Sequence, residues 1–174
     1  MRQTIVKMAA GVAGVLVAGS MLLPVSPASA QGTVATPACG NADLHATYRA
    51  TDAGMSHRYG RIVLRNVSDH SCRTGGYGGL SYVGRGNGTQ IGAAADRTPS
   101  KVRSIVLQPG QRVVSAVSAT VAGVYSHHQC RPAHVDGFRV YVPNETRSQF
   151  VKHPTTGCRN QSVHLISHKA YRRP

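Results

Sequence analysis

Short runs of alternating apolar and polar residues, rich in Val, Ile, Tyr and Thr, recur along the chain after its first forty residues. Gly, Pro, Asn and Asp separate these runs, and no long apolar pattern of helical period accompanies them. Because side chains of a β-strand point alternately to its two faces, such runs indicate strands with one buried face. Their close spacing predicts an all-β domain built as an antiparallel sandwich or barrel.

The same alternation predicts which side chains are buried. In the run Arg58–Asn66, Ile62 and Leu64 point inward and the intervening residues point outward. Gly86-Asn87-Gly88 predicts a hairpin turn, and Gln108-Pro109-Gly110-Gln111 predicts a type II turn. Residues 123–134 are expected to form a loop or a helical turn. The predicted strands are Asp43–Arg49, Arg58–Asn66, Leu80–Val83, Thr89–Ala94, Val102–Leu107, Arg112–Val121, Gly137–Val142 and Val163–Ser167.

The N-terminal segment, residues 1–30, has the order of a secretory signal peptide. Arg2 and Lys7 flank the start of an apolar stretch from Met8 to Leu23, and Ala28-Ser29-Ala30 provides the small residues of a cleavage site. The apolar stretch of roughly 16 residues is shorter than the ~20 that span a bilayer as a helix, so we expect cleavage after Ala30. The expected product is secreted and has no transmembrane segment.

The mature chain is expected to divide into three parts. Residues 31–38 form a short flexible leader, residues 39–167 form the β-sandwich domain, and residues 168–174 form a basic tail. The tail lacks apolar alternation, so we expect it to fray.

Export determines the interpretation of the four cysteines. In an oxidising compartment Cys39, Cys72, Cys130 and Cys158 are expected to form two disulfides rather than bind metal or act as nucleophiles. Four cysteines allow three pairings. We favour Cys39–Cys72 with Cys130–Cys158, because each closes a loop of about 30 residues, worth roughly 3 to 4 kcal/mol. A Cys39–Cys130 pairing stays open.

Several short motifs, in a fixed order with the cysteines, resemble a known family. They are Leu64-Arg65-Asn66-Val67-Ser68 before Cys72, Gly75-Gly76-Tyr77-Gly78 after it, Leu107-Gln108-Pro109-Gly110, Cys130-Arg131-Pro132 and Phe138-Arg139-Val140-Tyr141-Val142-Pro143. From about Cys39 to Ser167 the chain resembles the secreted actinobacterial domains of unknown function of family number 4232. The resemblance implies an immunoglobulin-like β-sandwich with two disulfides, and it implies no established activity and no catalytic residues.

Charge suggests the class of partner. The chain has 20 Lys and Arg against 6 Asp and Glu, and removal of Arg2 and Lys7 with the signal peptide lowers its net charge from +14 to +12. Such a charge attracts polyanions, although a solvated basic face is the plain alternative. Same-face cations able to bind phosphate or carboxylate are the pairs Arg61 with Arg65 and Lys101 with Arg103, together with Arg139.

We therefore expect a non-catalytic binding module for an anionic cell-envelope polymer, or for another extracellular protein. Nucleic acid is not expected as a partner because of the compartment, and no cofactor is expected. The first alternative is a zinc or copper site made by His127, His128 and His134. The second is a small secreted hydrolase, which is disfavoured because there is no Gly-x-Ser-x-Gly motif and Asp69-His70-Ser71 suits a turn better than a triad.

Overall fold

The computed structural model describes residues 35–174, so the predicted signal peptide and the first residues of the leader lie outside the described part. Within that part, none of the helices is long and apolar enough to cross a membrane. The elements in chain order are β1 (Leu44–Gly54), β2 (His57–Asn66), β3 (Cys72–Gly75), β4 (Gly79–Gly84), β5 (Thr89–Ala94), β6 (Asp96–Arg97), β7 (Ser104–Leu107), β8 (Arg112–Thr120), the 3-10 turn η1 (Ala122–Val124), α1 (His127–Cys130), β9 (Pro132–Tyr141), β10 (Ser148–Cys158) and β11 (Ile166–His168).

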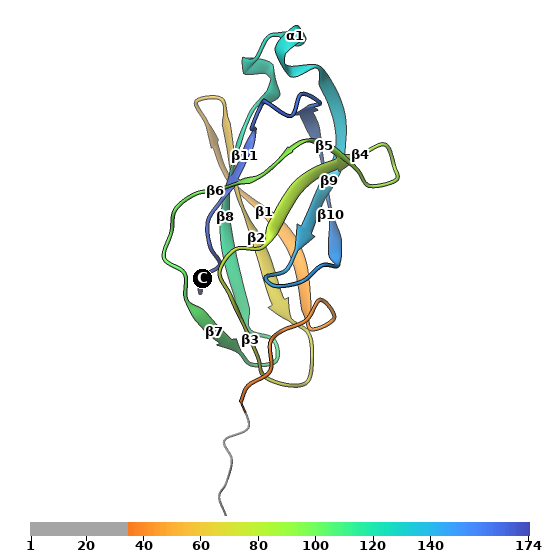
Figure 1. Cartoon of the computed structure of the whole chain (residues 1–174). Helices are drawn as coiled ribbons and strands as arrows, with labels where there is room; N and C mark the ends of the chain where they lie inside the picture. The colour runs from red at the N-terminus through yellow and green to blue at the C-terminus, as the bar shows by residue number, and fades with distance from the viewer. Residues whose placement is uncertain (1–34) are drawn as a thin grey trace, which may run out of the picture. The chain divides into compact units, whose positions relative to one another are not determined.

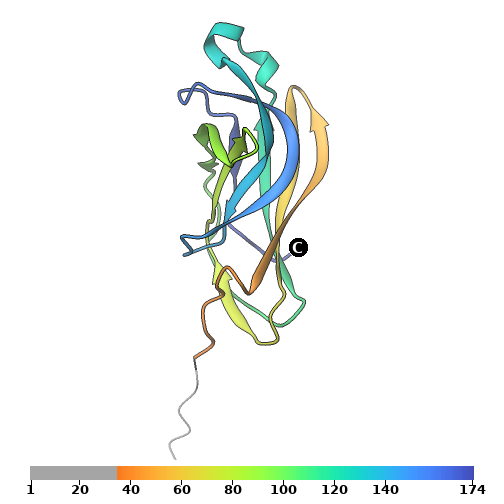
Figure 2. The same cartoon turned by 90° about the vertical axis from the view of Figure 1, so that its right-hand side faces the viewer.

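The strands form two main sheets and a small ribbon (Figures 1 and 2). One sheet has the order β1-β2-β8-β11-β6, the other has the order β10-β9-β4-β5, and β3 pairs with β7. The neighbour relations are those of an immunoglobulin-like sandwich: β1, β2 and β8 correspond to strands A, B and E, and β10, β9 and β4 correspond to G, F and C. The predicted sandwich is confirmed.

The core lies between the two sheets and follows the predicted alternation. Leu44, Ile62 and Leu64 from one sheet, and Phe138 and Val140 from the other, are each at most 1% exposed. Since the residues between them face outward, each strand contributes every second side chain to the core. The predicted turn at Gly110 is also present, with a positive φ of 79° and a hydrogen bond from the Gln111 N–H to the Gln108 carbonyl oxygen.

Strand β10 differs from the prediction, because the predicted strands include none between Val142 and Val163. Pro154 interrupts the strand pattern in the sequence, since proline cannot donate to a β-ladder. The structure tolerates Pro154 because β10 is the edge strand of its sheet and its register with β9 shifts between Lys152 and Thr155. The short strands β3 and β6 were not predicted either.

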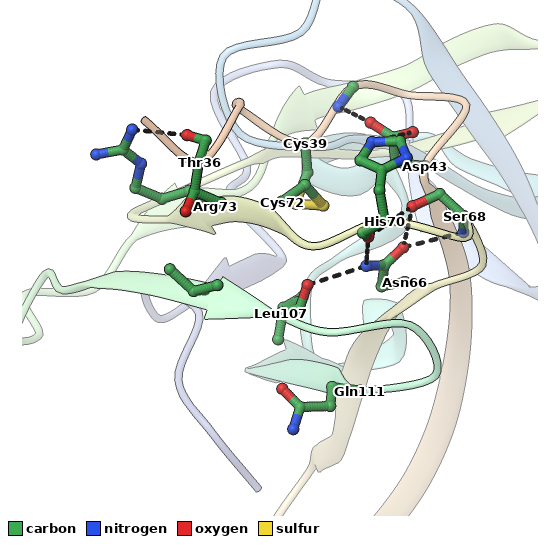
Figure 3. Close-up of a disulfide and its surroundings, with 12 residues drawn as sticks. Thr36, Cys39, Asp43, Asn66, Ser68, His70, Cys72, Arg73, Leu107 and Gln111 are labelled. Carbon is green, nitrogen blue, oxygen red and sulfur yellow. Dashed lines mark hydrogen bonds and ion pairs between the residues drawn. A yellow bond between two sulfur atoms is a disulfide. The ribbon is translucent and has the colours of Figure 1, made fainter. Parts of the chain in front are cut away.

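Both favoured disulfides are present, and all four cysteines are buried. The Cys39–Cys72 bond lies beside Asn66, whose side chain is fully buried (Figure 3). The Asn66 amide nitrogen donates to the carbonyl oxygens of His70 (2.9 Å) and Leu107 (3.0 Å), and its oxygen accepts from the N–H and hydroxyl of Ser68. This amide therefore joins the β2–β3 loop to the end of β7.

The C-terminal segment does not fray as expected but pairs with the sheets. Ala170 and Tyr171 are buried, Tyr171 forms a bridge with Gly76, and Arg172 forms an antiparallel bridge with Val114 of β8. The expectation was wrong because the anchoring contacts come from Tyr171 and from the backbone, neither of which needs an alternating pattern.

One side chain closes the exposed edge of β1. The Gln149 amide oxygen accepts from the Ala46 N–H at 2.8 Å, and its nitrogen donates to the Leu44 carbonyl oxygen. A side-chain amide thus supplies both halves of a ladder pair where β1 has no neighbouring strand.

We predict that Gln149→Leu lowers the free energy of unfolding by about 1 to 3 kcal/mol, because the Ala46 N–H and the Leu44 carbonyl lose their partners. Urea denaturation measures the change. Gln108→Leu, whose side chain is exposed, is the matched control. Equal unfolding midpoints for the two variants would contradict this role of Gln149.

A buried histidine makes the fold sensitive to acid. His168 is 4% exposed, contacts the Ser115 hydroxyl and packs edge-on against Tyr77. Burial, with the nearby positive charge of Arg97, lowers the pKa of His168 below its usual 6.5. The unfolded chain therefore binds a proton at a higher pH than the folded chain does, and stability falls as the pH drops below about 6.5.

We predict that the free energy of unfolding decreases between pH 7 and pH 5, by at most about 1.4 kcal/mol per pH unit for each such proton. His168→Gln should flatten this decrease, whereas His127→Gln at an exposed position should not. Urea denaturation at several pH values tests both variants, and identical slopes for wild type and His168→Gln would refute the assignment.

Candidate functional site

Four arginines face each other across the outer surface of the first sheet. The strand register places Arg49 of β1 directly opposite Arg61 of β2, and Arg65 of β2 directly opposite Arg112 of β8. His45 lies opposite Arg65 on its other side. Residues opposite each other in an antiparallel pair have Cβ atoms about 5 Å apart, and like charges at that distance destabilise the sheet.

Two apolar residues lie beneath these arginines. Val63 and Val114 are also opposite each other on the outer surface, yet they are only 8% and 4% exposed. Arg61 and Arg65 flank Val63 along β2, and Arg112 precedes Val114 on the same face of β8. Their aliphatic stems are placed to shield the valines while the guanidinium groups stay in water. The strands thus hold the charges on an apolar base.

A pocket of about 540 Å³ continues this surface toward β7. Lys101, Arg103, Lys169, Arg172 and Arg173 all line it, together with Ser100 and Ser104, and no carboxylate does. Arg172 joins the two regions, because it lines the pocket and lies opposite Val114. We call the combined surface the basic face; its cations are Arg49, Arg61, Arg65, Lys101, Arg103, Arg112, Lys169, Arg172 and Arg173.

The C-terminal segment that forms one wall of the pocket is held firmly. The Tyr171 N–H donates to the Gly76 carbonyl oxygen, and the Ala170 N–H donates to the Ser100 hydroxyl. One guanidinium nitrogen of Arg173 donates to the Val106 carbonyl oxygen at 2.9 Å. These contacts use neutral acceptors, so the pocket is ordered without its positive charge being neutralised.

Carboxylates do not neutralise the cations of the basic face. Every ion pair within residues 35–174 joins a histidine to an aspartate, and no lysine or arginine takes part in one. On the outer surface of the sheet, Asp52 and Asp96 lie in the same cross-strand row as Tyr59. This row is closer to the β1–β2 hairpin than the rows that contain the arginines. The surface therefore offers cations to an external anion.

Arg139 lies apart from the other predicted anion-binding residues. It is on β9, in the second sheet, and its guanidinium group donates to the Gly88 carbonyl oxygen in the β4–β5 turn. This contact makes Arg139 a support for that hairpin. Lys101 and Arg103 do lie together in the pocket, but in an irregular segment before β7 instead of the predicted strand.

The three predicted metal ligands do not assemble. His127 and His128 are exposed on α1, whereas His134 is on β9 and pairs with Asp136 at 3.4 Å. Within residues 35–174 no group of three His, Cys, Asp or Glu side chains is close enough to hold a metal ion. Cys130 is bonded to Cys158 and is no ligand.

The triad-like sequence Asp69-His70-Ser71 also lacks the geometry for nucleophilic catalysis. The His70 Nδ1 lies 3.2 Å from Asp69, and its Nε2 lies 3.7 Å from Asp43. A general base needs one ring nitrogen free to face the nucleophile. Because both nitrogens face carboxylates, His70 serves as a link between loops.

A family model described as a domain of unknown function, DUF4232, matches residues 39–168. The chain belongs to the DUF4232 family. The match begins at the first cysteine of the DUF4232 domain and ends at the last residue of β11. No curated protein and no solved structure matches the chain.

Sequence reasoning missed part of the basic face of this DUF4232 domain. Arg49 and Arg112 lie on the same outward face as Arg61 and Arg65. The alternation could have predicted this shared face once the strands were aligned. The contribution of Arg172 and Arg173 had no such signal, because it depends on the bridge of Arg172 to β8 and on the hydrogen bond of the Arg173 side chain to Val106 of β7.

We predict that Arg49→Thr raises the free energy of unfolding of the DUF4232 domain by a few tenths of a kcal/mol at low salt, because it removes a like-charge pair. The gain should shrink in about 1 M salt, where charges are screened within about 3 Å. Lys152→Thr on the other edge strand, opposite Gly137, is the control. An equal gain in the control, or a loss for Arg49→Thr at low salt, would refute the interpretation.

Proposed function

We propose that this protein is an exported, non-catalytic binding module whose basic face holds an anionic polymer of the cell envelope. The observation that carries the proposal is the register of Arg49 with Arg61 and of Arg65 with Arg112. Such facing cations cost stability in the free protein. A bound polyanion offsets that cost and converts the repulsion into binding free energy.

The spacing of the cations favours a polymer over a single small anion. Arg61 and Arg65 are four residues apart on one strand, which is about 13 Å at 3.3 Å per residue. This is the separation of their Cα atoms, and side chains stand roughly perpendicular to a sheet, so successive groups of a polyanion match the two guanidinium groups better than one phosphate or carboxylate does. Arginine also forms paired hydrogen bonds to phosphate and carboxylate oxygens. The pocket lined by Lys101 and Arg103 adds further cations to the same surface.

Two further features support export. The N-terminal segment has the composition and order of a signal peptide. The two disulfides suit an oxidising compartment, since such bonds are rare in the cytosol. An envelope polymer is a partner that an exported basic protein meets in that compartment.

We predict that the mature protein binds immobilised heparin and a purified teichoic acid, and elutes well above physiological salt. The double variant Arg61→Ala/Arg65→Ala should elute at clearly lower salt. Exposed charges are screened over about 8 Å at physiological ionic strength, so retention depends on the cations that lie next to the bound polymer. A salt gradient on both columns measures the effect, and circular dichroism checks that the variants are folded.

The charge-matched control is Arg85→Ala/Lys152→Ala, which removes two exposed cations from the β4–β5 turn and from β10. It should elute close to wild type. If both double variants shift equally, net charge alone drives retention and the basic face is not a site. Elution of the wild type at about physiological salt would also refute the proposal.

A further inference from the structure

A second cavity, of about 330 Å³, lies between the two sheets at the end of the sandwich near η1. Inward-facing residues of β1, β2, β4, β9 and β10 line it, together with the chain that leaves β8. We call this cavity the aromatic cleft. Its lining includes Tyr48, Arg58, Tyr82, Phe138 and His153. It is separate from the basic face, which is on the outer surface of the first sheet.

Aromatic rings packed against one another form the floor of the cleft. The rings of Phe138 and His153 are stacked almost parallel, with centroids 5.0 Å apart and planes at 6°. Tyr48 packs against both, at 4.5 Å from His153 and 5.1 Å from Phe138, and Tyr82 stacks on Phe138 with ring centroids 5.1 Å apart. Flat aromatic surfaces held in this way provide a surface for a ring-shaped ligand.

Gly60 makes room for this arrangement. It lies on the inward face of β2, and a Cβ at this position would collide with the Tyr48 ring and hydroxyl. The absence of a side chain lets Tyr48 lean from the edge strand β1 across β2 toward the middle of the sandwich. The position of the Tyr48 ring in the cleft therefore depends on the glycine at position 60.

The cleft contains hydrogen-bonding groups that are neutral at pH 7. Tyr82 is only 5% exposed, and it lines the cleft. Burial, with Tyr48 nearby, raises the pKa of Tyr82 to about 12, and burial lowers the pKa of His153. The Tyr82 hydroxyl can both donate a hydrogen bond to a ligand in the cleft and accept one from it.

One charge stands among these neutral groups. Arg58 occupies an inward-facing position of β2, two residues before Gly60, and lines the cleft. Its guanidinium group donates to the His57 carbonyl oxygen at 3.2 Å, and it forms no ion pair within residues 35–174. The Arg58 side chain is exposed, so it lines the cleft where the cleft opens to solvent, and an arginine there without a carboxylate is suited to hold an anionic group of a ligand.

We propose that the aromatic cleft binds a small cyclic carboxylate. The carboxylate pairs with Arg58, the ring lies against Tyr48 and His153, and a polar substituent reaches the Tyr82 hydroxyl. This site does not depend on the basic face, and its ligand is a single small molecule instead of a polymer.

The probe is 4-hydroxybenzoate, titrated into the mature protein by calorimetry and by NMR at physiological salt. We expect saturable binding with a Kd of about 1 mM or tighter, as is usual for a ligand of this size in a partly open pocket. Acetate, which has the charge without the ring, and 4-hydroxybenzyl alcohol, which has the ring without the charge, should each bind at least about tenfold more weakly.

Two variants and one control test the residues. Arg58→Gln should weaken 4-hydroxybenzoate binding by about tenfold or more, and Tyr82→Phe should weaken it severalfold while keeping the ring. Arg61→Gln removes the same charge from the opposite face of β2 and should leave the affinity unchanged. Arg58→Gln and Tyr82→Phe should elute from heparin close to wild type, which shows that they are folded and that the basic face is intact. Arg61→Gln removes a basic-face cation, so circular dichroism checks its folding.

Three results would overturn the proposal. One is the absence of saturable binding up to about 10 mM probe, far above the expected affinity. Another is an equal loss in Arg58→Gln and Arg61→Gln, which would assign binding to net charge. The third is acetate binding as tightly as 4-hydroxybenzoate, which would show that the ring makes no contact.

Discussion

Strand β2 lies between β1 and β8, and one of its faces is buried against the opposite sheet. Ile62 and Leu64 are almost completely buried, and a shift of register by one residue would turn Arg61, Val63 and Arg65 inward in their place. The packing of this single strand therefore determines which side chains reach the outer surface. Since β1 and β8 pair with β2 in the matching register, their outward cations fall into the same rows. Core burial and the display of charge are two results of the same constraint.

Separate tethers hold the two ends of the sandwich. The Cys39–Cys72 bond and the Asn66 amide fix the end near β3 and β7 (Figure 3), and the Cys130–Cys158 bond ties the end of α1 to the end of β10. The basic pocket lies where the C-terminal segment joins β7, and the aromatic cleft lies between the sheets near η1. Both candidate sites are thus beside tethered segments, which limits how far their walls can move.

Alternation was sufficient to predict an antiparallel sandwich or barrel, most of its strands and the outward direction of Arg61 and Arg65, and the family resemblance favoured the sandwich. It failed at β10, because Pro154 and Lys152 are unfavourable in a central strand and only the edge position makes them acceptable. It also failed at the tail, where burial of Tyr171 replaces periodicity. The aromatic cleft was not predictable from local pattern, because the approach of Tyr48 to Gly60 and the stacking of Phe138 on His153 depend on long-range packing.

The buried amide of Asn66 has a consequence for producing this protein in a foreign host. Asn66-Val67-Ser68 matches the acceptor sequence for N-linked glycans. Its nitrogen, the atom that would carry the sugar, is completely enclosed and already donates to two carbonyl oxygens. A eukaryotic secretory pathway that attached a glycan there before folding would leave a chain unable to close this end of the domain. Production in a bacterial periplasm, or of a Ser68→Ala variant in eukaryotic cells, avoids glycosylation of Asn66.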